Sequence, residues 1–315
     1  MRKLFVALAI VVAAAAAAPA PFTQEPVAID SGAVHLAGTL VVPTGPGPFP
    51  VALIVAGSGP TDRDGNGPML KTDAYRLLAE DLAGRGIATL RYDKRGVGAS
   101  KTPQSESELR FDDFVADALT LAKYLETDRR FAGVSIVGHS EGSLIAMIAA
   151  QRDSHVKSVV SLEGAGRDAA TIVDEQVGHS GASPTIVSEV ESIDKSLRAG
   201  TPVPSPDPKL AALFRPSVQP YLISWYKFDP AAVIAMLSIP VLIVQGTTDI
   251  QVTVADAKAL AAADPHAQLL IVPGANHVLR DAPADRAGNI ATYNEPQLPL
   301  NPAIVDAVAT FLTRD

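Results

Sequence analysis

Short apolar runs alternate with amphipathic stretches along most of this 315-residue chain. The runs are rich in Val, Ile and Leu and predict strands, and the stretches with apolar residues three and four apart predict helices. This alternation is typical of a parallel sheet with helices on both faces, so we predict the α/β class and a mostly parallel, doubly wound sheet. The predicted strands are 35–43, 51–56, 87–93, 134–140, 156–164, 240–249 and 268–277, and the predicted helices are 73–86, 111–128, 143–151, 254–264 and 303–314.

One segment, about 165–236, departs from this alternation. It holds helical pieces, a proline-rich loop at 199–209 and an aromatic stretch at 221–230, but no strand pattern. A structureless connection of this length would be unusual in a compact domain. Because the aromatic residues supply surface worth burying, which flexible linkers lack, we predict an inserted helical cap.

The first 20 residues are a separate unit. Arg2 and Lys3 precede an apolar stretch, 4–18, that runs into small residues and Pro19. This order is typical of a secretory signal peptide, and the many alanines make the stretch too weakly apolar for a membrane anchor. We therefore expect an exported protein, periplasmic or extracellular, with one domain at 21–315 that carries the cap. The sequence contains no cysteine, which excludes disulfides and lipid attachment to cysteine.

Charge narrows the range of partners. Without Arg2 and Lys3, 24 basic residues face 34 acidic ones, a net charge of −10. Nucleic acid and anionic lipid are bound through a basic face, so neither is expected as a partner, nor is membrane attachment once the signal is removed. We expect a small-molecule substrate, and no motif calls for a cofactor or a metal. The sequence leaves the oligomeric state open.

The strongest chemical signal is the G-x-S-x-G pattern at 138–142, which joins a predicted strand to a predicted helix. In this context the serine lies on a tight turn with small neighbours, and its hydroxyl projects above the carboxyl end of the sheet. The backbone N–H of the next residue lies at the helix start and can face a developing oxyanion. We therefore predict Ser140 as a nucleophile and the N–H of Glu141 as an oxyanion donor.

A serine hydroxyl needs a base, so one of the six histidines must approach Ser140. His266 and His277 lie at opposite ends of one predicted strand, roughly 20 Å apart. Ligands bind at the carboxyl ends of the strands in such sheets, which favours His277. The remaining histidines, which lie in an early strand, in the turn, before a strand and in the cap, are His35, His139, His155 and His179.

The imidazole in turn needs an acid that fixes its tautomer and stabilises its charge. Asp249 follows one predicted strand and Glu163 follows the strand before it, both at carboxyl ends. The chain order Ser, Asp, His is the one found with the G-x-S-x-G elbow, and it favours Asp249. Glu163 is the alternative.

The stretch 57–67, GSGPTDRDGNG, follows the strand before the first helix, where a second oxyanion donor is expected. Its glycines allow the backbone to approach a substrate closely. We predict the N–H of Ser58 as this donor, with the N–H of Gly59 as the alternative. A phosphate-binding loop is excluded because no Lys-Ser or Lys-Thr follows at the required spacing.

The same stretch copies the start of a calcium loop. Its polar residues fall at positions one, three, five, six and twelve of that motif, namely Asp62, Asp64, Asn66, Gly67 and Asp73. A calcium loop has a bidentate glutamate at the last position and a helix on each side. Here the last residue is aspartate and a strand precedes the loop. We therefore expect these side chains to tie down the loop that carries the oxyanion donor.

Four motifs together resemble the α/β-hydrolase superfamily: GHSEGS, RYDKRGVGAS, GSGPTDRDGN, and the run from IPVLIVQGTTDIQV to PGANH. Within it, nearly the whole mature chain is most similar to exported bacterial esterases close to the serine-aminopeptidase-like (S33-type) branch. The resemblance implies Ser140 as nucleophile, His277 as base, Asp249 as acid, and an ester of modest size as substrate. It also implies a structural role for the loop 91–96. Glu141 departs from the many relatives with an uncharged residue there, and we expect its carboxylate to point into the cap and disfavour acidic substrates.

The predicted activity is that of a carboxylesterase-like serine hydrolase, which cleaves small to medium esters through an acyl-enzyme intermediate. The alternatives are an aminopeptidase or amidase acting on short peptides, and a non-catalytic binding protein that keeps the fold. The aromatic residues of the cap either line the acyl pocket or form the core of the cap. They are Tyr221, Trp225, Tyr226 and Phe228.

Overall fold

A computed structural model describes residues 21–314, so the predicted signal peptide at 1–20 lies outside the described residues. Eight strands form one sheet in the order β1-β2-β4-β3-β5-β6-β7-β8. The pairs β1–β2 and β2–β4 are antiparallel, and all pairs from β4 to β8 are parallel, which confirms the predicted α/β class. The strands are β1 (Phe22–Ser31), β2 (Val34–Pro43), β3 (Phe49–Val55), β4 (Ala88–Tyr92), β5 (Phe131–His139), β6 (Val156–Leu162), β7 (Val241–Gly246) and β8 (Gln268–Val272).

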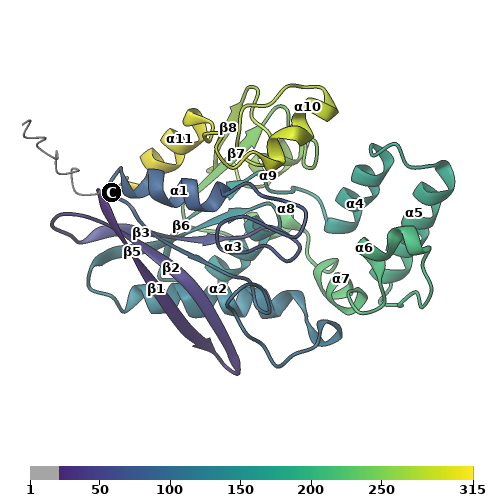
Figure 1. Ribbon diagram of the computed structural model, residues 1–315, viewed down its shortest axis with the longest axis horizontal. Helices are drawn as coiled ribbons and strands as arrows, with labels where there is room; N and C mark the ends of the chain where they lie inside the picture. The colour runs from purple at the N-terminus through teal and green to yellow at the C-terminus, as the bar shows by residue number, and fades with distance from the viewer. Residues whose placement is uncertain (1–20, 315) are drawn as a thin grey trace, which may run out of the picture.

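Helices cover both faces of the sheet (Figure 1). Successive side chains of a strand point to opposite faces, so each central strand contributes to two cores. On β3, for example, Leu53 belongs to the core with α2 and α3, and Ile54 belongs to the core with α1 and α11. The helices of these two layers are α1 (Ala74–Ala83) and α11 (Pro302–Leu312) on one face, and α2 (Phe111–Glu126), α3 (Glu141–Arg152), α8 (Pro230–Ile234) and α9 (Val254–Ala263) on the other.

The edge strand β1 has no counterpart among the predicted strands. It pairs with β2 along its whole length, from Phe22 opposite Pro43 to Ser31 opposite Val34. Its residues are exposed or half-buried throughout, so the apolar run that marks the inner strands is missing. Pro26 lies within it, which is compatible with an edge strand and unfavourable in a central one.

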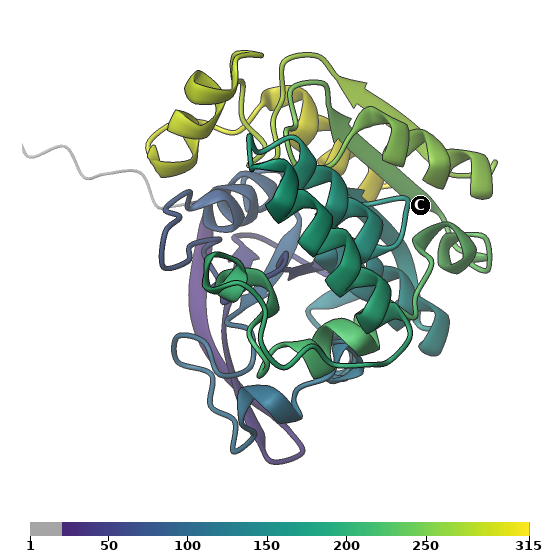
Figure 2. The ribbon, with the colours of Figure 1, turned by 90° about the vertical axis from the view of Figure 1, so that its right-hand side faces the viewer.

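A group of helices occupies the predicted cap segment and lies to one side of the sheet (Figure 1). Figure 2 shows these helices from the front. They enclose a small core of their own, in which Val190, Leu197 and Phe214 are buried. The helices are α4 (Ala169–Gly178), α5 (Pro184–Arg198), α6 (Ala211–Phe214) and α7 (Gln219–Trp225). Within residues 21–314, no helix combines the length and the apolar character needed to cross a membrane.

The turn between β5 and α3 has an unusual backbone. Ser140 has φ 55° and ψ −121°, a conformation that residues with a side chain rarely adopt. Glycine is required on both sides of this turn. A Cβ at Gly138 would lie 2.1 Å from the carbonyl oxygen of Gly142, and a Cβ at Gly142 would lie 2.3 Å from that of Val55. The small residues of the G-x-S-x-G pattern therefore allow α3 to pack directly against β3.

We expect Gly142→Ala to destabilise the fold by at least about 2 kcal/mol, because the new methyl group would collide with the backbone of β3. Gly178 is the matched control, since it also lies in a helix and an added Cβ there meets nothing within 4 Å. Gly178→Ala should be neutral or should stabilise the protein by up to about 1 kcal/mol. Urea unfolding measures both changes, and equal effects of the two substitutions would contradict the assignment.

Candidate active site

Ser140 lies at the carboxyl end of β5, in the middle of the sheet, and immediately precedes α3. Its N–H donates a hydrogen bond to the carbonyl oxygen of Leu162 on β6, 2.9 Å away, which fixes the turn to the neighbouring strand. Ser140 lines a cavity of about 450 Å³ beneath the cap. It also lines a smaller cavity of about 90 Å³ together with Ser58 and His277.

The loops after β7 and β8 bring Asp249 and His277 together. The Nδ1 atom of His277 lies 2.7 Å from Oδ2 of Asp249, and the two side chains are only 6% and 0% exposed. The other oxygen of Asp249 accepts hydrogen bonds from the N–H groups of Gln251 and Val252, at 2.7 and 3.0 Å. Burial opposes ionisation of Asp249, but the charge of His277 and these hydrogen bonds lower its pKa below the ordinary value. Nδ1 of His277 faces Asp249, and Nε2 makes no hydrogen bond within residues 21–314; His277 and Ser140 both line the smaller cavity.

Glu163, the alternative acid, lies behind Asp249. Its two carboxylate oxygens are each 3.0 Å from the N–H of Gly246, and one is 2.5 Å from Nε2 of Gln245. Burial raises the pKa of Glu163 well above its usual range, and the charge of Asp249 and a hydrogen bond with that residue raise it further. Among the described residues, the carboxylate bonded to the ring of His277 is that of Asp249.

A buried chain of hydrogen bonds connects three segments. They are the loop 57–67 that carries the predicted oxyanion donor (the oxyanion loop), the turn 138–142 that carries Ser140 (the elbow), and the loop that carries His277. The N–H of Gly57 donates to the hydroxyl of Tyr75 at 3.1 Å, this hydroxyl lies 2.7 Å from Nδ1 of His139, and Nε2 of His139 lies 2.7 Å from the carbonyl oxygen of His277. A carbonyl can only accept, so Nε2 of His139 carries the proton and Nδ1 accepts from Tyr75. Burial, and then the charge of His277, lower the pKa of His139 to about 3, so the ring is neutral.

Sequence reasoning missed this role for His139 and for Tyr75. The histidine was noted only as part of the turn, and Tyr75 only as part of the helix 73–86. The hydrogen bond joins residues 64 positions apart, and no spacing rule marks such a pair. A histidine beside the nucleophile was the one signal available.

The loop 57–59 lies directly against the elbow. A Cβ at Gly57 would be 3.1 Å from Cβ of Ser140, so a larger residue here would require the two segments to shift by a few tenths of an ångström. Ser58, Gly59 and Glu141 line the large cavity together with Ser140. Within residues 21–314, neither the N–H of Ser58 nor that of Glu141 donates a hydrogen bond to another protein group. Both predicted oxyanion donors therefore border the cavity with their N–H groups free.

The polar side chains that follow hold this loop in place. One oxygen of Asp62 accepts from the N–H groups of Asp64 and Asn66, at 2.8 and 2.9 Å. The amide of Asn66 forms two hydrogen bonds with Asp73, one to the side chain and one to the N–H. These contacts agree with the expectation that the calcium-like residues tie down the loop.

The loop 91–96 after β4 makes the next set of contacts. Arg91 pairs with Asp64 at 2.9 Å, and Asp93 pairs with Arg63 at 2.6 Å. Both ion pairs join this loop to the oxyanion loop, which is the structural role that the resemblance implies.

The chain is similar in sequence to a known family and to a curated relative over part of its length. A sequence model of the family described as "Serine aminopeptidase, S33" matches residues 67–179, which include Ser140 but neither Asp249 nor His277. Esterase EstD of Thermotoga maritima is 28% identical over 242 residues, which are 76% of this chain and 55% of that protein. The chain thus spans about half the length of this curated relative.

Two solved structures are similar over most of the chain. Est1E from Butyrivibrio proteoclasticus, with ferulic acid bound, has a TM-score of 0.59 at 19% identity, over 90% of this chain and 99% of that chain. The Pyrococcus furiosus esterase Pf2001 has a TM-score of 0.57 at 16% identity, over 93% of each chain. The chain has the α/β-hydrolase fold.

The carboxylate of Glu141, which we expected to point into the cap, forms an ion pair with a buried lysine. Its Oε1 lies 3.1 Å from Nζ of Lys94, and the two side chains are 1% and 5% exposed. A carboxylate in the buried first turn of α3 needs a counter-charge, and the loop after β4 supplies it. Lys94 offsets the charge on which the expected bias against acidic substrates rests, and that bias stays a prediction. No sequence pattern marked this pair, whose members are 47 positions apart.

The cap shapes the cavity of the hydrolase. Tyr221, Trp225 and Tyr226 line it, whereas Phe228 packs on Phe111 with ring centroids 5.3 Å apart. Three of the four predicted aromatic residues thus border the cavity, and the fourth joins the core below.

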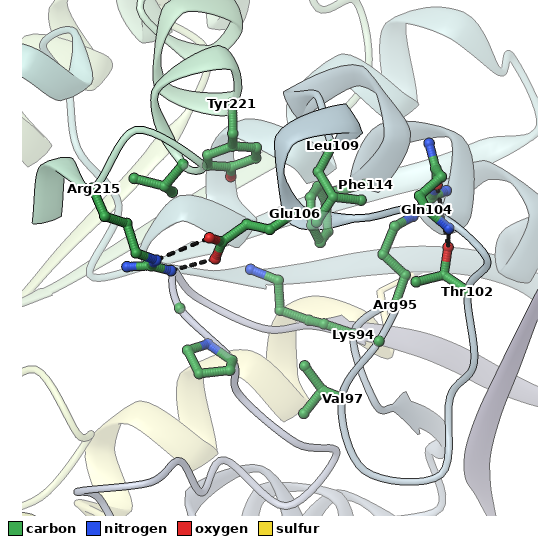
Figure 3. Close-up of a pocket in the computed structure, with 14 residues that line it drawn as sticks. Lys94, Arg95, Val97, Thr102, Gln104, Glu106, Leu109, Phe114, Arg215 and Tyr221 are labelled. Atoms are coloured by element: carbon green, nitrogen blue, oxygen red, sulfur yellow. Dashed lines mark hydrogen bonds and ion pairs between the residues drawn. The ribbon is translucent and has the colours of Figure 1, made fainter. Parts of the chain in front are cut away.

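A second chamber of about 350 Å³ continues from the first one past Gly59 and Tyr221. Figure 3 shows Glu106 paired with Arg215 in the wall of this chamber, with Lys94 nearby. The ion pair between Glu106 and Arg215 joins the loop before α2 to the cap. The two chambers have several wall residues in common, and Ser140 lines the one under the cap.

One cluster among the described residues has ligand atoms close enough to hold a metal ion. Glu126, Asp153 and His155 lie within 4.8 Å of one another. Glu126 ends α2, and Asp153 and His155 follow α3, so the cluster lies at the amino end of the parallel strands, opposite to Ser140. The cluster is therefore separate from the candidate active site.

We expect His139 to stay neutral, with its proton on Nε2, far below the pH at which a solvated histidine is protonated. Its folded-state pKa of about 3 lies below the ordinary 6.5, so its contribution to stability is complete above pH 6.5 and is lost as the pH falls toward 3. Long-range ¹H–¹⁵N NMR spectra of the imidazole nitrogens, recorded from pH 8 to pH 4.5, measure this directly. A titration of His139 near pH 6.5 would contradict the assigned hydrogen-bond chain.

Proposed function

We propose that this α/β-hydrolase is a serine esterase that cleaves small to medium carboxylic esters through an acyl-enzyme intermediate. The observation that carries the proposal is the convergence of Ser140, the Asp249-bonded imidazole of His277 and two free N–H groups on connected cavities. The esterase names of the curated relative and of the similar structures support the same reaction.

In the proposed mechanism, Oγ of Ser140 attacks the ester carbonyl while Nε2 of His277 takes its proton. The negative charge that develops on the carbonyl oxygen is stabilised by the N–H groups of Ser58 and Glu141. His277 then gives the proton to the leaving alcohol, and Asp249 stabilises the imidazolium. Water, activated by His277 in the same way, hydrolyses the acyl-enzyme and restores Ser140.

The shape of the cleft supports an apolar group on one side of the ester bond. The chamber under the cap has a volume of about 450 Å³, within the range of small-molecule sites, and apolar and aromatic side chains make up most of its wall. Its charged side chains are held in ion pairs: Glu141 with Lys94, Arg215 with Glu106, and Arg167 with Asp256. Uncharged esters suit such a wall better than charged ones.

The family description makes an aminopeptidase the second candidate. Such an enzyme needs an unpaired carboxylate to bind the amino terminus of its substrate. Near the cavity, Glu106 and Glu141 are both committed to cations, which favours the esterase. Relative rates on p-nitrophenyl butyrate and on an aminoacyl p-nitroanilide separate the two.

We expect Ser140→Ala to abolish hydrolysis of p-nitrophenyl butyrate and labelling by a fluorophosphonate, with folding unchanged by circular dichroism. Ser58→Ala is the matched control. It removes a hydroxyl but keeps the N–H that the mechanism uses, so its rate should stay within about threefold of wild type, well short of the loss from deleting a donor. Undiminished turnover by Ser140→Ala would remove Ser140 from the mechanism, and a wild-type protein that is never labelled would favour the non-catalytic binding protein.

Substitution of Asp249 should lower kcat much more than substitution of Glu163. Asp249→Asn leaves the imidazole without its charged partner and is expected to lower kcat by about 10⁴-fold. Glu163→Gln replaces a protonated carboxyl by a neutral amide of the same shape and should lower kcat far less. Steady-state kinetics on the same ester compare the two variants. A larger loss from Glu163→Gln would reverse the assignment of the acid.

A further inference from the structure

Lys94 is a buried cation whose position is not explained by stability alone. Its Nζ donates to the carbonyl oxygen of Gly57 at 3.0 Å and to Oε1 of Glu141 at 3.1 Å, and it lies 4.7 Å from the centre of the Phe114 ring. The side chain is only 5% exposed. A buried ion pair is often no more stabilising than apolar residues of the same volume. The two groups that accept hydrogen bonds from this ammonium therefore point to a role besides stability.

The first acceptor belongs to a peptide group that the mechanism uses. The carbonyl of Gly57 and the N–H of Ser58 are parts of one planar trans peptide, so they point in opposite directions. A hydrogen bond that fixes the carbonyl also fixes the direction of this N–H. Glycine restrains its own backbone less than any other residue, so an external restraint matters here. The charged donor also polarises the peptide, which makes the N–H of Ser58 a stronger donor.

The second acceptor belongs to the residue that supplies the other donor. Glu141 contributes its backbone N–H to the proposed oxyanion hole, while its carboxylate is held by Lys94. The ammonium of Lys94 thus contacts Gly57, whose carbonyl shares a peptide group with the N–H of Ser58, and Glu141, which supplies the other N–H. Because α3 is anchored by the elbow, Lys94 connects the loop 57–59 to a fixed point.

We propose that Lys94 is a positioning residue of the oxyanion hole, which aligns the N–H group of Ser58 with that of Glu141 by connecting the carbonyl of Gly57 to the carboxylate of Glu141. This inference rests on the proposed esterase function. Lys94 acts through the two backbone donors, so its loss should weaken binding of the transition state and leave binding of the ground state nearly intact.

The test compares wild type with Lys94→Met, whose side chain has similar length and no charge. Complete removal of one oxyanion donor typically lowers kcat by about 10²–10³-fold, so a misaligned donor should cost about 10–100-fold in kcat, with KM changed less than about threefold. The affinity for a trifluoromethyl ketone, which forms a tetrahedral oxyanion on Ser140, should fall by the same factor as kcat. The affinity for a matching methyl ketone, which stays mostly trigonal, should change far less.

Lys94→Met leaves the Glu141 carboxylate buried without a counter-charge, which could itself unfold the protein. The double variant Lys94→Met/Glu141→Gln removes that charge and still leaves the carbonyl of Gly57 without its donor. We expect this variant to fold, as judged by urea unfolding, and to stay slow in kcat.

Different results would contradict the proposed esterase function and the role of Lys94. A wild-type protein with no esterase turnover, or an active Ser140→Ala variant, would overturn the proposed function itself. An active wild type together with a folded double variant of undiminished kcat would overturn only the role of Lys94. Equal losses of affinity for both ketones would do the same, because they would indicate a general collapse of the site.

Discussion

The arrangement of the site depends on the two hydrogen bonds of the neutral imidazole of His139. This imidazole binds Tyr75 on one side and the carbonyl of His277 on the other, and Tyr75 in turn binds Gly57. Oxyanion loop, elbow and base-bearing loop come from distant parts of the chain, and this ring holds all three. Protonation would place a second donor at Nδ1, facing a hydroxyl that now donates to it. Burial prevents this over the ordinary pH range.

Ion pairs also neutralise the charged side chains in the wall of the cleft. Lys94 is matched by Glu141, Arg215 by Glu106, and the ionised Asp249 faces His277. In a largely apolar cleft an unpaired charge would be costly and would attract substrate groups of the opposite sign. Pairing leaves the imidazole of His277 and the free N–H groups of Ser58 and Glu141 among the polar groups that a reacting ester would meet. A site of this kind favours charge that develops during the reaction over charge already present in the substrate.

Sequence patterns predicted the inner sheet, its flanking helices and the contact between His277 and Asp249, because each depends on local order: apolar runs, a strand–turn–helix pattern and positions at carboxyl ends of strands. They missed β1, whose exposed residues form no apolar run. They also missed Lys94 with Glu141 and Tyr75 with His139, since these pairs form only when distant segments pack. The ion pair of Glu141 is an example: a buried charge implies a partner, but the sequence does not say which one.

The choice between Asp249 and Glu163 depends on where one proton resides. Both carboxyl groups are fully buried beside the same strand ends, and two ionised carboxylates in contact would repel each other strongly. Asp249 has the nearby imidazole and two backbone N–H groups to stabilise its charge, and Glu163 has the N–H of Gly246 and the amide of Gln245. The imidazolium that forms during catalysis adds a full charge on the side of Asp249 alone. The ionised form is therefore favoured at Asp249 and the protonated form at Glu163, and the hydrogen bond between them helps to stabilise the negative charge that His277 faces.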